Sequence, residues 1–95
     1  MPRQIHNDLI GFSRNEAITR IKMMRLRPQM WAVTREGLFL QVSILLEICG
    51  LTRNEALNWE QSVHPQSEGD WHPEAYVDND YAEIVCLSAL MAIPE

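Results

Sequence analysis

The chain has 95 residues, of which 46% are hydrophobic, and a formal net charge of −5. This length suits one domain with a real core, which we expect to be a single helical domain over residues 1–95, and the hydrophobic content excludes wholesale disorder. No apolar segment is long enough to span a membrane and the first residues lack a signal-peptide core, so we expect a cytoplasmic protein.

The charges are distributed unevenly along the sequence. Residues 1–35 carry seven basic and two acidic residues, a net charge of +5, whereas residues 36–95 carry one basic and eleven acidic residues, a net charge of −10. This asymmetry indicates a charged contact surface, either basic or acidic. Attraction between two faces of one monomer would explain it equally well.

The first expected elements are two helices on either side of Gly11. A short helix is expected over residues 3–10, and a second one over residues 13–27, where Pro28 ends it. The flanks of the second helix are basic. These basic residues are candidate nucleic-acid contacts: Arg14, Arg20, Lys22, Arg25 and Arg27.

The second helix has apolar residues on two sides. Ala17, Ile21 and Met24 share one face, whereas Met23 and Leu26 fall on the far side. We therefore expect this helix to be covered twice.

Residues 30–42 are compatible with two structures. Two apolar runs on either side of Gly37 are typical of a short hairpin. The alternative is a long helix that is capped by Thr34 and continues to Cys49. We favour the helix because of the length of the run and because Gly50 provides a helix stop.

A stretch around Gly11 recurs thirty-nine positions later. Residues 8–18 and 47–57 share five of eleven residues. In each copy a glycine suited to a left-handed helix end precedes a Ser or Thr cap, and a Glu three residues on completes a capping box. The copies predict two related helix-turn-helix corners, the second leading into a helix from Thr52 to about Ser62.

The segment from Ile44 to Glu60 resembles the helix-turn-helix of phage repressor-like regulators, whose second helix lies in the major groove of DNA. The resemblance implies that the groove-facing residues are Arg53, Asn54, Glu55 and Asn58, since Arg suits guanine and Asn suits adenine. The alternative is an ordinary corner between two helices. We favour the corner, because the surroundings are acidic and phosphate contacts dominate affinity for DNA.

Residues 63–78 predict a long acidic loop, interrupted by Pro and Gly. Its aromatic residues lie among acids, a combination typical of a protein contact with a charged rim. An equally good alternative is that the aromatic residues fold back as lids over the helices. The candidate partner-binding residues are Trp71, Tyr76, Glu68, Asp70 and Glu74.

A last helix is expected to begin near Asp80 and to end before Pro94. It is apolar around most of its circumference, so it needs to be covered by this chain or by another one. A homodimer through this helix is one arrangement that would cover it.

No pattern for catalysis, a cofactor or a metal stands out. Cys49 and Cys86 lie in apolar runs, where burial makes a thiol inert. His64 and His72 lack the spacing or the cysteine partners of a metal site. We therefore expect no enzyme, no cofactor and no metal site.

These observations predict an all-α bundle of about five helices. The expected function is that of a non-catalytic regulatory or interaction protein that binds a larger protein partner, such as a phage- or plasmid-type inhibitor or adaptor. The alternative is a helix-turn-helix transcriptional regulator that binds DNA.

Overall fold

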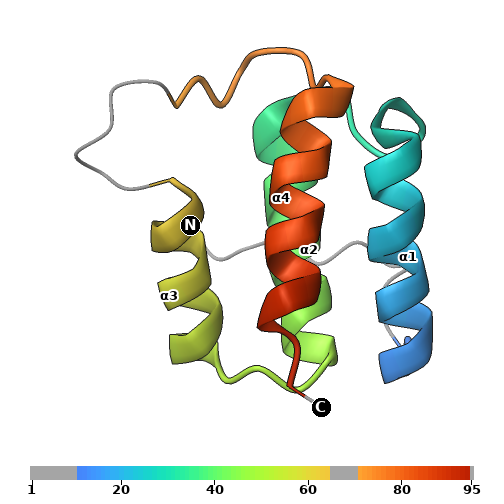
Figure 1. Ribbon diagram of the computed structural model, residues 1–95, viewed down its shortest axis with the longest axis vertical. Helices are drawn as coiled ribbons and strands as arrows, with labels where there is room; N and C mark the ends of the chain where they lie inside the picture. The colour runs from blue at the N-terminus through green and yellow to red at the C-terminus, as the bar shows by residue number, and fades with distance from the viewer. Residues whose placement is uncertain (1–10, 65–70, 95) are drawn as a thin grey trace.

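The computed structural model describes residues 11–64 and 71–94. They form four α-helices and one short 3₁₀ helix, which are in chain order α1 (Arg14–Leu26), η2 (Pro28–Met30), α2 (Arg35–Ile48), α3 (Arg53–Val63) and α4 (Asn79–Ala92). Helix α2 packs against α1, α3 and α4, and α4 also contacts both α1 and α3 (Figure 1). The prediction of an all-α fold is confirmed.

The number of helices differs from the prediction of about five. The described residues contain four α-helices. The helix expected over residues 3–10 lies outside them, and so does the leading helix of the first expected corner. Where the second corner is expected, residues 49–52 join α2 to α3.

Residues 30–42 do not form a hairpin. Helix α2 begins after Thr34, whose hydroxyl oxygen accepts a hydrogen bond from the backbone N–H of Gly37 at 3.1 Å. Thr34 instead forms an isolated antiparallel bridge with Tyr76. The residues before α2 are thus extended where they pair with the later loop. The predicted helix over the rest of this segment is correct.

The loop before α4 is anchored on the first turn of α2. The backbone N–H of Arg35 donates to the carbonyl of Ala75 at 2.9 Å, and that of Glu36 donates to the carbonyl of Pro73 at 3.1 Å. The first N–H groups of a helix have no partner within the helix itself. Here the loop supplies the acceptors, so these hydrogen bonds hold the loop against one end of the bundle.

Both predicted capping boxes are present. The hydroxyl of Ser13 accepts from the N–H of Glu16 at 3.2 Å, and the Glu16 carboxylate accepts from the N–H of Ser13 at 3.0 Å. Thr52 and Glu55 make the same two hydrogen bonds at 3.1 and 2.9 Å. These hydrogen bonds hold the pKa of each glutamate below its usual value.

The core is centred on α2. From Leu38 to Leu46 of this helix, every residue except Leu40 is buried. Ile21 and Met24 of α1 and Val85 of α4 are fully buried against it. Helix α4 is covered on one face, where it presents the small buried residues Ala82, Cys86 and Ala89.

Candidate interaction surfaces

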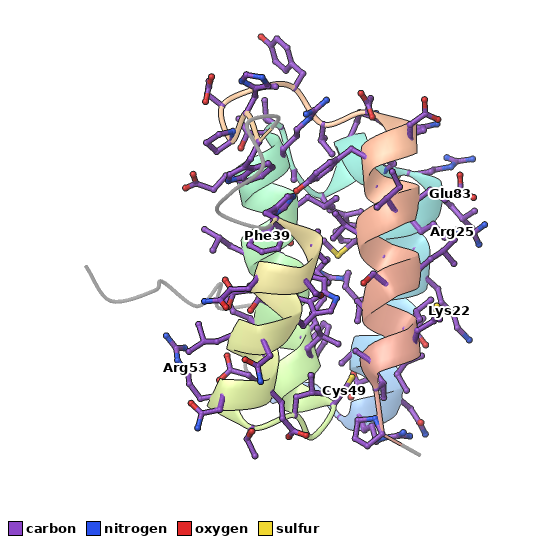
Figure 2. All side chains as sticks on the ribbon, turned by 60° about the vertical axis from the view of Figure 1, so that its left-hand side comes forward. Lys22, Arg25, Phe39, Cys49, Arg53 and Glu83 are labelled. Carbon is purple, nitrogen blue, oxygen red and sulfur yellow. The ribbon has the colours of Figure 1, made fainter. Side chains whose placement is uncertain are left out.

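Trp71, a predicted partner-binding residue, is half-buried. Its ring stacks on the imidazole of His64, with ring centroids 3.7 Å apart and planes inclined by 19°. Phe39 and Tyr81 lie 5.9 and 5.8 Å from it, centroid to centroid. We call Phe39, His64, Trp71 and Tyr81 the aromatic cluster; Figure 2 shows Phe39 among packed side chains near the first turns of α2.

The other predicted loop contacts are placed differently. Tyr76 is 81% exposed, and Glu74 is exposed as well. Glu68 and Asp70 lie outside the described residues. Trp71 therefore has the placement of a lid over the helices, whereas Tyr76 and Glu74 face the solvent.

His64 links α3 to α4 through the aromatic cluster. Its Nε2 lies 3.0 Å from the hydroxyl of Tyr81, and its ring packs edge-on against Phe39 at 4.4 Å between centroids. Burial, together with the nearby Arg35 guanidinium, lowers the pKa of His64 below 6.5. The cluster therefore favours the neutral imidazole. Burial also raises the pKa of the Tyr81 hydroxyl, which keeps it a hydrogen-bond donor.

Three of the predicted nucleic-acid contacts are engaged within the chain. Arg14 donates to the carbonyl of Pro94. Arg25 pairs with Glu83 of α4 at 3.2 Å, and Figure 2 shows the two side by side. Arg53 lies 3.8 Å from the carboxylate of Glu47. In this view Arg53 is on the opposite side of the molecule from Arg25, so the two predicted sets of DNA contacts do not form one surface.

The remaining predicted nucleic-acid contacts lie around α1 and at the start of α3. The guanidinium of Arg20 lies 4.1 Å from the centroid of Trp31 and 5.1 Å from that of Phe12. The other three are exposed and make no side-chain hydrogen bond or ion pair within residues 11–64 and 71–94: Lys22, Arg27 and Asn54.

An exposed apolar surface lies on α1 and η2. Met23, Leu26 and Met30 are 45%, 68% and 65% exposed, so the expected second cover over α1 is absent from the described part of the chain. Two adjoining grooves of about 350 and 310 Å³ meet at Met23 and Trp31. We call this region the α1–η2 surface; it consists of Met23, Leu26, Met30 and Trp31 with the surrounding Arg20, Lys22 and Arg27.

Sequence reasoning did not select the α1–η2 surface as a contact site. Its signal was the pair Met23 and Leu26 on the side of α1 opposite the buried face. The helical periodicity predicted that these two residues would be covered. It did not show whether another part of this chain or a partner would cover them.

A second apolar region follows α4. Ile84 and Met91 are exposed, and Met91 borders a groove of about 440 Å³ between α3 and α4. Trp59 forms part of this groove, and its indole N–H donates to the hydroxyl of Ser88 at 3.1 Å. The helix predicted to form a homodimer thus keeps an uncovered apolar stripe.

The two thiols have the properties of core residues. Cys49 and Cys86 are buried and free. Burial raises both pKa values, that of Cys86 to about 12, so both are protonated at neutral pH. Among the residues that the structure describes, no three His, Cys, Asp or Glu side chains are grouped to hold a metal ion. No helix in the same residues is long and apolar enough to cross a membrane.

Comparisons with protein-family models, with curated proteins and with solved structures find no match for this chain.

Proposed function

We propose that this protein is a non-catalytic interaction protein, such as an inhibitor or adaptor, that binds a larger protein partner through the α1–η2 surface. The observation that carries the proposal is the exposure of Met23, Leu26 and Met30, which line one groove. Contiguous exposed apolar side chains within a polar surround are typical of protein contact sites.

The composition of this surface supports the proposal. Methionine, arginine and tryptophan are enriched at protein interfaces, and hot spots often contain Trp and Arg. Here Arg20 stacks on Trp31, which holds both side chains in one arrangement before a partner arrives. Less side-chain entropy is then lost on binding.

The acidic loop is the weaker candidate for the main contact. Its largest aromatic residue, Trp71, packs against His64 and Phe39. Exposing Trp71 to a partner would disrupt that packing. Among the predicted contacts in the described part of the loop, Tyr76 and Glu74 are free to add to an interface from outside the cluster.

The test is affinity capture from the native host, with nuclease treatment, using two double variants. Leu26→Gln with Met30→Gln removes apolar contacts from the α1–η2 surface. Ile84→Gln with Met91→Gln makes the same chemical change on α4, at residues that are 66% and 87% exposed. We expect the first variant to lose a protein that the wild type and the second variant retain. Equal capture by all three proteins would contradict the proposal.

The alternative function is DNA binding through the basic flanks of α1. It is supported by the exposed Lys22 and Arg27, which have no acidic partner within the described ranges. Affinity for duplex DNA would then fall steeply with salt, and Lys22→Ala with Arg27→Ala would weaken it. Capture that survives nuclease, together with the absence of salt-dependent DNA binding, would exclude this alternative.

A further inference from the structure

The apolar side chains of the α1–η2 surface form a strip. Met23 and Leu26 are three residues apart in α1 and therefore lie on the same side of the helix, and Met30 of η2 lines the same groove as both. A second groove continues past Met23 along α1 to Phe12. An elongated apolar strip of this kind fits the side chains that one face of a helix presents at positions i, i+3, i+4 and i+7.

Positive charges lie on both sides of the strip. By helical periodicity, Arg20 and Arg27 lie along one flank of α1 and Lys22 along the other. Among the residues that the structure describes, the acid that borders the grooves is Glu16, whose carboxylate is occupied in the capping box with Ser13. The strip is therefore apolar in the middle and basic at both edges.

We infer that the partner segment that fills the α1–η2 surface is an acidic amphipathic helix, an inference that rests on the function proposed above. An apolar face flanked by glutamates or aspartates on both sides matches this strip in charge as well as in hydrophobicity. Such complementarity favours correct partners and disfavours basic ones.

Other occupants match only part of the surface. A DNA backbone would pair with Lys22 and Arg27, but it would place phosphates against Leu26 and Met30. A second copy of this chain that offered the apolar stripe of α4 would present Glu83, which is already paired with Arg25. The acidic helix satisfies the apolar and the basic parts together.

The experiment uses two fluorescein-labelled peptides of about 16 residues, long enough to form a helix in water. Both carry leucine at positions i, i+3, i+4 and i+7. One has glutamate on both flanks of the leucine face, and the other has lysine at the same positions. Binding to the full chain is measured by fluorescence anisotropy at low and high salt. We expect the acidic peptide to bind roughly tenfold more tightly at low salt, and this preference to shrink at high salt.

Two charge-reversed variants test which basic residues cause the preference for the acidic peptide. Lys22→Glu with Arg27→Glu should invert the preference between the peptides. Arg14→Glu with Arg53→Glu changes the net charge equally at the first positions of α1 and α3, where glutamate suits the helix dipole. This control should retain the preference for the acidic peptide. Circular dichroism verifies that each variant keeps its helices.

Three results would overturn the inference. Equal affinity for the two peptides would mean that charge does not select the partner. Absence of binding by the acidic peptide, with capture still dependent on Leu26 and Met30, would reject the acidic helix and leave the proposed function intact. Concentration-dependent dimerisation that Leu26→Gln abolishes would show that a second copy is the occupant.

Discussion

The guanidinium of Arg20 lies 4.1 Å from the centroid of the Trp31 ring. The same guanidinium lies 5.1 Å from the centroid of the Phe12 ring. A cation over an aromatic ring contributes about 0.5–2 kcal/mol, depending on its exposure. We expect Arg20→Gln to lower the free energy of unfolding by about 1 kcal/mol, measured by urea denaturation. Lys22→Gln is the matched control and should change it by less than about 0.5 kcal/mol. Equal effects of both variants would mean that the stacked arrangement contributes nothing.

Trp71 and Tyr76 are expected to differ sharply in their contribution to stability. Trp71→Ala removes a ring stacked on His64, so it should lower the free energy of unfolding by roughly 2 kcal/mol. Tyr76→Ala removes a ring that is 81% exposed and should have a small effect. Thermal melts of the two variants test this difference. A Trp71→Ala protein as stable as the wild type would show that the ring is not part of the core.

Acid should loosen the end of the bundle that holds the aromatic cluster. The pKa of His64 is lowered in the folded protein, so the unfolded chain binds a proton more readily as the pH falls through 6.5. Stability from the neutral imidazole is therefore complete above about pH 7 and is lost progressively below pH 6.5. Urea midpoints measured between about pH 7.5 and 5 should fall over this range.

Two variants test whether His64 causes this pH dependence of stability. His64→Phe keeps an aromatic ring in the cluster and removes the titration, so its midpoint should change less between the two pH values. His72→Gln, in the exposed loop, should keep the wild-type dependence. The capping glutamates Glu16 and Glu55 also have lowered pKa values, but their contribution is lost only below their usual pKa of 4.5. An unchanged slope in His64→Phe would refute the assignment.

Gly50 is expected to resist substitution because of its backbone and not because of crowding. Its φ is +109°, and the nearest atom to an added Cβ is the Cγ of Pro94 at 3.9 Å, which is an ordinary contact. Alanine there should lower the free energy of unfolding by about 1–2 kcal/mol, since L residues rarely adopt such angles. Asn54→Ala, an exposed change nearby on α3, is the control. Calorimetry of both variants measures their stability, and the Gly50 variant should be the less stable of the two.

The limits of the helices were predictable because local chemistry marks them. Thr34 and Thr52 each accept a hydrogen bond from the backbone N–H three residues on, and Pro28 ends α1 whatever surrounds it. These devices act over a few residues, so the sequence contains them completely. The bridge from Thr34 to Tyr76 could not be predicted in this way, because it joins segments far apart in the chain.

The candidate site was less predictable for a related reason. Periodicity places Met23 and Leu26 opposite the buried face of α1, but whether another element covers them depends on the whole fold. The position of Trp71 likewise depends on Phe39 and Tyr81, which belong to two different helices. Composition alone drew attention to the acidic loop, where aromatic residues are conspicuous among charges.

The contact between Arg14 and the carbonyl of Pro94 has a practical consequence for binding measurements. It holds the end of α4 beside the first residue of α1, and the helix of 13 residues then runs about 20 Å before it reaches Leu26. A biotin or a surface linker attached after Pro94 would therefore be anchored at the far end of the molecule from Met30. A sensor chip prepared in this way would leave the α1–η2 surface pointing toward the solution.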